Sequence, residues 1–350
     1  MPESLWTRIA DLPLVVEAHD VTSLAAPAPA DRLTLLVALR GRGEEGQGED
    51  VGGNMMDPEG AFLRAAAALE LAGEWTLASF AEHLRGLDLW PEPPEWDLAR
   101  RFRNWSFESA ALDLALRQAG AGLPEVLGRE PRPVRFVNSL GLGDPPAFEA
   151  VGHRLERYPD LRFKLDAQAS WSPELIARVA ETGAVDIVDF KGRYGLPVDD
   201  EFALVAMYEQ VLERFDGVIF EDPHDRPDVA ALMAPRAAQV SFDAPIGTAA
   251  DVEGADFGAR IVNVKPSRIG GLQALSGVYA HCEAEGLLMY GGGMGEVGIA
   301  RGQIELLAAL FHPDGPNDVA PSRYNELELP AGLDESPLRP VADVVGFRWS

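Results

Sequence analysis

Between Val134 and Val319 the hydrophobic and polar positions follow one repeating pattern. Each repeat has a short apolar run, rich in β-branched residues, followed by a longer stretch with an apolar face. In SPELIARVAETG, for example, Leu175, Ile176 and Val179 share one face, which predicts an amphipathic helix. The short runs predict strands: VRFVNSL, LRFKLDAQ, VDIVDFKG, GVIFEDP, AQVSFDAP, RIVNVKPS, GLLMYGGG and NDVAP.

This alternation of strands and helices predicts an α/β fold with parallel strands and right-handed crossovers. Eight strand candidates favour closure into a (β/α) barrel of the TIM type, in which the strand C-termini form the active face. NDVAP is the weakest of the eight, and an open, doubly wound sheet is the competing architecture.

The N-terminal third has a different pattern. LTLLVALR predicts a strand, and the Gly- and charge-rich run GRGEEGQGED, residues 41–50, predicts the turn of an antiparallel hairpin. PEGAFLRAAAALELAG and WSFESAALDLALRQAG predict two helices. We therefore predict an α+β domain over residues 1–130, completed by residues 321–350, and a barrel domain over residues 131–320.

Composition narrows the class of protein. The 350 residues are 47% hydrophobic, enough for a sizeable core. The chain carries 30 Lys and Arg against 56 Asp and Glu, a net charge of −26, so nucleic acid is not an expected partner. Cys282 is the only cysteine, which excludes a disulfide framework and a Cys-rich metal site. Neither a signal-peptide pattern nor a long apolar span is present, so we expect a cytoplasmic protein without a membrane partner.

Ionisable residues stand at the C-terminal ends of consecutive predicted strands, where a barrel places its active site. For two of these residues, Asp222 and Asp225, helix capping is the preferred interpretation, because they stand just ahead of a predicted helix. The remaining residues of this kind are, in chain order, Lys164, Asp166, Asp189, Lys191, Glu221, Asp243 and Lys265.

Three carboxylates that meet at one barrel mouth repel one another unless a cation lies between them. The candidate ligands are all oxygen atoms, and no His or Cys stands at matching positions. That donor set favours a hard divalent ion, Mg²⁺ ahead of Mn²⁺ and well ahead of Zn²⁺. His224 follows Glu221 closely but is assigned no role, because a histidine at a loop start is more often a surface residue than a ligand.

Over nearly its whole length the chain resembles the enolase superfamily, and within it the muconate lactonizing enzyme subgroup, which includes o-succinylbenzoate synthases, N-succinylamino acid racemases and dipeptide epimerases. LVALRGRGEEGQGED resembles the hairpin of the family's capping domain, and VNVKPSRIGGLQAL with MYGGGMGEVGIARGQIELLAAL resembles its sixth and seventh barrel units. The resemblance implies a modified TIM barrel with an α+β N-terminal capping domain. It also implies that Asp189, Glu221 and Asp243 bind the metal, that Lys265 is the base and that Lys164 faces it across the substrate.

The reaction implied by this resemblance is removal of a proton α to a carboxylate. Bound Mg²⁺ stabilises the enediolate that forms, and a lysine held close to a cation has a lowered pKa and can act as a base. The enediolate then goes on to elimination, cycloisomerisation or racemisation.

One motif departs from the subgroup. In the subgroup, the second barrel strand commonly ends Lys-x-Lys, and the second lysine is the base. In this chain, Lys164 is followed after one residue by Asp166. Asp166 is then a candidate base or a candidate metal ligand, because DAQASW also resembles the segment around the family's first ligand. We assign the ligand role to Asp189, since only this register puts Lys265 on the sixth of eight strands. Lys191 would share its side of the strand with Asp189, as a salt-bridge partner or a second cation for the substrate.

The run GGGMGEVG follows the seventh predicted strand. It matches a dinucleotide-binding fingerprint, but the remaining chain is too short to complete such a domain. We predict instead that its backbone N–H groups, near a helix start, bind a substrate anion, with Gly293 and Glu296 in the pocket. Further substrate contacts are expected from the capping-domain loops, residues 19–32 and 52–60, whose Ala, Pro and Met content suggests an apolar lining.

Two functions stay open. The first is a Mg²⁺-dependent lyase or isomerase that acts on a small-molecule carboxylate. Dipeptide epimerisation ranks low, because Ala320 stands where a second acid would be expected beside Asp318. The second is a catalytically silent enolase-like barrel that binds a metal and a carboxylate or serves in an assembly. A homo-oligomer is compatible with either.

Overall fold

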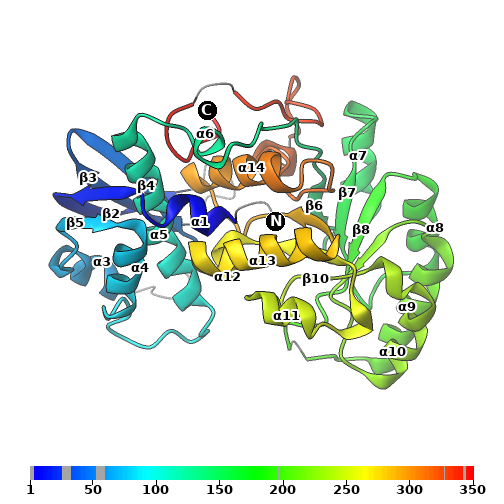
Figure 1. Ribbon diagram of the computed structural model, residues 1–350. Coiled ribbons are helices and arrows are strands. Elements are labelled where there is room, and N and C mark those ends of the chain that lie inside the picture. The colour runs from blue at the N-terminus through cyan, green and yellow to red at the C-terminus, as the bar shows by residue number, and fades with distance from the viewer. Residues whose placement is uncertain (1–3, 26–32, 53–59, 196, 327, 342–343) are drawn as a thin grey trace.

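A computed structural model of the protein describes residues 4–25, 33–52, 60–195, 197–326, 328–341 and 344–350. An N-terminal part with antiparallel strands lies beside a larger part built on a parallel sheet (Figure 1). Within the described residues, no helix combines the length and the apolar character needed to cross a membrane.

The N-terminal part is built on two small antiparallel sheets and the long helix α5, with shorter helices around them. Its elements are α1 (Leu5–Ile9), β1 (Pro13–Val16), β2 (Ala18–Ala25), β3 (Leu33–Gly41), β4 (Glu44–Asp50), α3 (Ala61–Ala65), β5 (Gly73–Thr76), α4 (Leu77–Arg85), α5 (Ala99–Ala119) and α6 (Leu123–Leu127). The sheet orders are β2-β3-β4 and β1-β5. The first of the two predicted helices is thus much shorter than expected, since α3 is soon followed by the strand β5.

The hairpin forms as predicted, but its turn is far shorter than the Gly-rich run over residues 41–50. Only Arg42 and Gly43 make the turn, with φ values of 53° and 79° that suit a two-residue hairpin loop. The rest of the run is the strand β4, so that part of the sequence prediction was wrong.

The glycines of β4 have a packing role instead. A Cβ atom on Gly46 would lie 2.2 Å from the backbone nitrogen of Leu114, and a Cβ atom on Gly48 would lie 2.0 Å from the carbonyl oxygen of Ser106. Both contacts are to α5, so the missing side chains let the helix lie directly against the strand backbone.

The larger part alternates strands and helices. Its elements are β6 (Asn138–Gly141), α7 (Glu149–Arg157), β7 (Phe163–Asp166), α8 (Pro173–Glu181), β8 (Val185–Asp189), α9 (Glu201–Arg214), β9 (Ile219–Glu221), α10 (Pro227–Met233), β10 (Val240–Phe242), α11 (Ala249–Glu253), β11 (Ile261–Val264), α12 (Pro266–Ile269), α13 (Leu272–Glu285), β12 (Leu288–Gly291) and α14 (Ile299–Phe311). The strands from β6 to β12 form one parallel sheet in sequence order. The α/β class and the parallel pairing predicted from the sequence are therefore present.

The eighth predicted strand, NDVAP, is replaced by two isolated bridges. Asn317 bridges to Phe136, just before β6, and Asp318 bridges to Gly292, just after β12. The Asn317 side chain adds to this link, since its Oδ1 atom accepts a hydrogen bond from the backbone N–H of Gly291 at 2.8 Å. This segment thus contacts both edges of the sheet without forming a regular strand.

His312 is buried beside this segment as a neutral imidazole. Its Nδ1 atom donates to Asn317 Oδ1 at 2.6 Å, because the amide nitrogen of Asn317 faces three carbonyl oxygens and Oδ1 can only accept. Burial lowers the pKa of His312 to about 4. The folded state therefore binds fewer protons than the unfolded chain between that value and the ordinary histidine pKa of about 6.5.

We therefore expect His312 to lower the stability of the protein as the pH falls from about 6.5 to about 4, by on the order of 3 kcal/mol in total. Denaturant unfolding across this range, with His312→Gln as the comparison, measures the effect. The difference between the two proteins should shrink as the pH falls. A pH-independent difference would contradict the assignment.

Candidate active site

The predicted site residues lie at the carboxyl ends of neighbouring parallel strands. In the strand register Asp166 of β7 is paired with Asp189 of β8, and Asp189 is paired with Glu221 of β9. Asp243 directly follows β10, and Lys265 directly follows β11. Because parallel strands end at the same edge of a sheet, these charged groups are brought together.

The three predicted metal-binding carboxylates are fully buried, and lysines of the chain contact them. The Lys164 Nζ atom donates a short hydrogen bond to Glu221 Oε1 and lies 3.1 Å from Asp189 Oδ2. The Lys265 Nζ atom donates to Asp243 Oδ2 at 2.9 Å. The sequence predicted a cation between the three acids. In this structure the positive charge beside them comes from the ammonium groups of Lys164 and Lys265.

Two residues that the sequence analysis missed complete the surroundings of Asp243. Arg268 Nη1 lies 2.8 Å from Asp243 Oδ1, an ion pair without the alignment of a hydrogen bond. Tyr194 OH donates to Asp243 Oδ2 at 3.1 Å and accepts from Arg268 Nη2 at 2.7 Å. Arg268 lies on α12, three residues after Lys265. This spacing of about one helical turn was a sequence signal that could have identified Arg268. Tyr194 lies in a loop, where the sequence offered none.

Glu221 is also held by neutral donors that the sequence analysis missed. Tyr290 OH donates a short hydrogen bond to Glu221 Oε2, and Asn263 Nδ2 lies 3.3 Å from both carboxylate oxygens. Asn263 precedes Lys265 by two residues and so shares its side of β11. The alternation along this strand was a usable signal for Asn263.

Burial and neighbouring charges act in opposite directions on Asp189 and Lys164. Burial would raise the pKa of Asp189, but the ammonium groups of Lys164 and Lys191 hold it well below its usual range. Burial would lower the pKa of Lys164, but the charges of Asp189 and Glu221 hold it well above its usual value. Both groups are therefore charged at neutral pH.

The other two acids differ from each other. Burial would raise the pKa of Asp243, but Arg268 and Lys265 outweigh it and hold the pKa well below its usual range. Burial raises the pKa of Glu221 to about 8, even with Lys164 beside it. As the pH falls, Glu221 is therefore the first of these acids to take up a proton, while Lys164 keeps its own.

Asp222 is not the helix cap that the sequence predicted, and neither is Asp225, because α10 begins at Pro227 without a side-chain cap. Asp222 is buried with a φ of 47°, and its carboxylate accepts the backbone N–H groups of Asp243 at 2.9 Å and Ala244 at 2.8 Å. It fixes the strand end that carries Asp243. Burial, together with the charge of Asp243, raises the pKa of Asp222 to about 6.

Lys191 lies between the acids of β7 and β8. Its Nζ atom donates to Asp189 Oδ2 at 2.6 Å and lies 3.2 Å from Asp166 Oδ1. Its φ of 53° is a left-handed conformation that costs a non-glycine residue about 1–3 kcal/mol. Asp189 thus contacts both Lys191 and Lys164, whereas among the described residues Asp166 has an ion pair with Lys191 alone. The salt-bridge role of Lys191 is present, and its contact with a substrate stays a prediction.

The backbone N–H groups after β12 are occupied by carboxylates of the chain. Glu296 Oε2 accepts the N–H groups of Met294 at 2.7 Å and Gly295 at 3.0 Å. A Cβ atom on Gly293 would lie 2.1 Å from the same oxygen, so this glycine makes room for the Glu296 side chain. In this structure the bound anion is therefore Glu296 itself, and substrate contacts of Gly293 and Glu296 stay predictions.

Glu49 of β4 binds the same loop from the N-terminal part. Its carboxylate accepts the N–H groups of Val297 at 2.7 Å and Gly298 at 2.9 Å, together with the Thr34 hydroxyl at 2.8 Å. These amides lead into α14, whose N-terminal dipole favours the negative charge. Of the two loops expected to line the pocket, residues 26–32 and 53–59 lie outside the described residues, whereas residues 19–25 belong to the strand β2 and do not form a loop.

The carboxylates suit Mg²⁺ in their chemistry. Within the described part of the chain, no three His, Cys, Asp or Glu side chains gather as a metal site. However, three buried carboxylates supply only oxygen donors, and Asp243 Oδ1 has no hydrogen-bond partner there. Lys164 contacts two of these acids, so a metal ion bound to them would compete with its ammonium group.

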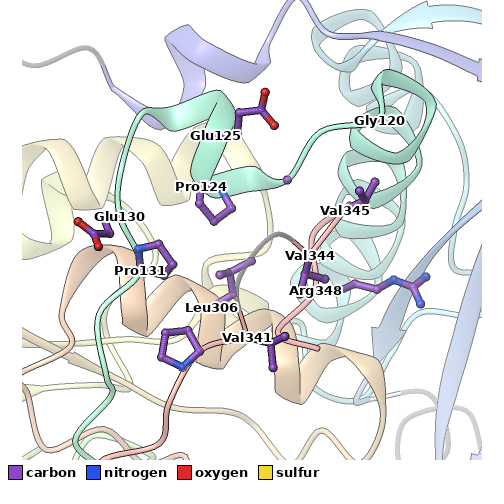
Figure 2. Close-up of a pocket in the computed structure, with 12 residues that line it drawn as sticks. Gly120, Pro124, Glu125, Glu130, Pro131, Leu306, Val341, Val344, Val345 and Arg348 are labelled. Atoms are coloured by element: carbon purple, nitrogen blue, oxygen red, sulfur yellow. The ribbon is translucent and has the colours of Figure 1, made fainter.

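A hollow of about 580 Å³ lies away from this cluster, between α6, α14 and the C-terminal segment. Figure 2 shows Pro124, Pro131, Leu306 and Val341 around it. None of the predicted site residues lines this hollow, so it is distinct from the predicted active site.

Comparisons with known proteins agree with the fold and the motifs. The chain matches the family described as "Domain of unknown function (DUF8230)", with the N-terminal domain over residues 7–126 and the C-terminal domain over residues 130–326. The N-succinylamino acid racemase of Thermus thermophilus is 30% identical over 373 residues, covering 99% of this chain and 93% of that protein. The N-succinylamino acid racemase of Amycolatopsis sp. and the o-succinylbenzoate synthase of Bacillus subtilis are 30% and 28% identical, and each alignment spans 61% of the relative.

Solved structures show the same fold. The muconate lactonizing enzyme of Pseudomonas putida has a TM-score of 0.64 at 21% identity, covering 85% of each chain. A dipeptide epimerase from Methylococcus capsulatus, complexed with Mg ion, has a TM-score of 0.63 at 20% identity, covering 87% of this chain and 89% of that one. The chain belongs to the enolase superfamily. More narrowly, it carries both domains of the DUF8230 family.

Proposed function

We propose that the protein removes a proton α to a carboxylate of a small-molecule acid and that the enediolate goes on to elimination, cycloisomerisation or racemisation. The observation that carries this proposal is the burial of Lys265 and Lys164 against three carboxylates at one edge of the parallel sheet. Relatives named as racemases and synthases of succinylated acids support the same class of reaction.

In this proposal Lys265 is the base. Its Nζ atom is held 2.9 Å from Asp243 Oδ2, so its position is fixed before a substrate arrives. One base suffices for a syn elimination or a cycloisomerisation. Racemisation needs a second group to return the proton, and Asp166 stands where the subgroup commonly has that lysine. Lys164 and Lys191 remain protonated and supply positive charge for the substrate carboxylate.

Asp189, Glu221 and Asp243 are the residues that would hold Mg²⁺, with Mn²⁺ as the second choice. When bound, the metal would stabilise the two negatively charged oxygens of the enediolate. Lys164 would have to release Asp189 and Glu221 for this to occur.

The proposal includes two features of the fold. Residues 317 and 318 close the sheet into a barrel, supported by their bridges to both of its edges. Residues 321–350 complete the capping domain, residues 1–130, beside a barrel over residues 131–320. The pairing of Gly346 with Gly122 and the hydrogen bond from Phe347 N to Asp113 on α5 support this division.

Exchange of the α-hydrogen for deuterium in D₂O tests the reaction. N-succinylamino acids and o-succinylbenzoate-type acids are incubated with the protein and Mg²⁺, with EDTA in parallel, and exchange is followed by NMR. We expect Mg²⁺-dependent exchange with at least one acid.

A catalytically silent barrel is the alternative, and two observations favour it. The predicted metal ligands are already paired with Lys164, Lys191, Lys265 and Arg268, and Asp166 replaces a lysine of the subgroup. Acids that bind without any exchange would support this alternative over the enzyme.

A further inference from the structure

A second hollow, of about 490 Å³, opens beside the carboxylate cluster. It lies between the segment that leads into α5 and the loops at the carboxyl ends of β8, β10 and β11. Its lining residues are Trp96, Asp97, Leu98, Arg101, Arg193, Tyr194, Ala244, Pro245 and Arg268. We call it the Arg101 pocket. Tyr194 and Arg268 also contact Asp243, so the pocket adjoins the proposed reaction centre.

Arg268 brings a buried, incompletely satisfied cation into this pocket. The residue is 1% exposed, yet its Nε and Nη1 atoms have no hydrogen-bond partner within the described residues. Nη1 has only the ion pair with Asp243. A buried donor without an acceptor is costly, so an anion in the pocket would relieve it.

The Arg101 side chain packs against two glycines of the larger part. A Cβ atom on Gly247 would lie 1.9 Å from Arg101 Nη1, and a Cβ atom on Gly270 would lie 2.5 Å from Arg101 Cβ. Within the described chain, Arg101 has neither an ion pair nor a side-chain hydrogen bond. The N-terminal part therefore presents a positioned guanidinium whose charge is not neutralised by the chain.

The other charges in the pocket are already paired. Arg193 has an ion pair with Asp256 at 2.7 Å, and Asp97 has one with Arg100 at 2.9 Å. The pocket therefore has an excess of positive charge, which comes from Arg101. The Nε and Nη1 atoms of Arg268 add two donors without a hydrogen-bond partner among the described residues. Trp96, 37% exposed, gives one wall an aromatic surface.

We propose that the Arg101 pocket binds a second anionic group of the substrate, joined to the reacting end by an apolar or aromatic spacer, and that Arg101 and Trp96 determine this specificity. The inference rests on the proposed function for the identity of the reacting end. It assigns recognition of the remote end to the first turn of α5 and the segment before it, in addition to the loops named in the sequence analysis.

Binding of two matched acids tests the proposal by calorimetry. o-Succinylbenzoate carries a second carboxylate that 4-oxo-4-phenylbutanoate lacks. We expect the wild type to bind the diacid more tightly, and Arg101→Gln to reduce that preference about tenfold, as loss of a charge-assisted hydrogen bond would. Arg132→Gln is the matched control, because Arg132 is an exposed arginine that is paired with the exposed Asp314 and does not line the pocket.

Gly247→Ala provides an independent variant. The added methyl group would push the Arg101 guanidinium aside without altering α5, so it should weaken the preference for the diacid in the same direction. Circular dichroism melts verify that all three variants are folded.

The proposal is overturned if Arg101→Gln weakens both acids equally, or if Arg132→Gln has the same effect as Arg101→Gln. Failure of the proposed function gives a different result. In that case the diacid would bind through Arg101, but no acid would exchange its α-hydrogen.

Discussion

Replacing Lys265 by alanine is expected to reduce the rate of α-hydrogen exchange by about 10²- to 10⁴-fold, the usual contribution of a positioned general base. Lys265 is 5% exposed and lies against Asp243, so water has little access to replace it as the base. The rate of deuterium incorporation in D₂O, measured for the best acid of the panel, gives the result directly.

Two controls distinguish loss of the base from loss of the site. Added methylamine should partly restore exchange in Lys265→Ala, because a small amine can occupy the space of the missing ammonium group. Asp166→Asn should keep exchange but lose racemisation if Asp166 returns the proton. Unchanged exchange in Lys265→Ala would remove this residue from the mechanism.

Replacing Lys164 by methionine is expected to destabilise the protein by about 3–5 kcal/mol in the absence of metal, because Asp189 and Glu221 would stay buried without their shared cation. Mg²⁺ should recover much of that loss. A ligand present at 100 times its dissociation constant contributes about 2.7 kcal/mol. The shift of the melting temperature with Mg²⁺ and with Mn²⁺ measures this, and Mn²⁺ binding can also be followed by electron paramagnetic resonance.

Arg103→Met is the matched control. Arg103 and Asp50 form a buried ion pair at 2.9 Å in the N-terminal part, away from the predicted metal ligands. This variant should also be less stable, but metal should stabilise it less than Lys164→Met, because its Lys164 still competes for Asp189 and Glu221. If Mg²⁺ and Mn²⁺ stabilise Lys164→Met no more than Arg103→Met, then Asp189 and Glu221 are not metal ligands.

The arrangement of the parallel sheet could be predicted because two features repeat along the sequence. Short apolar runs mark the strands, and polar residues at their ends mark the edge where the charged groups meet. Lys164, Asp189, Glu221, Asp243 and Lys265 were found in this way, and the structure brings them together.

Other features depend on contacts between distant segments, which no local pattern contains. The glycines of β4 indicated a turn, but their role is set by α5, about 60 residues further along the chain. Asp222 precedes a predicted helix and looked like a cap, yet it binds the backbone that carries Asp243. Tyr290 and Tyr194 contact the cluster only because the tertiary fold brings distant segments together.

The Glu49 carboxylate has a practical consequence for protein engineering. It links β4 to the first amides of α14, so the N-terminal part supplies an electrostatic partner to a helix of the larger part. Chimaeras that exchange the N-terminal segment between relatives should therefore retain an acid at this position. Without it, the loop that contains Glu296 would lose its anchor, and a change in substrate preference could be misattributed to the transplanted residues.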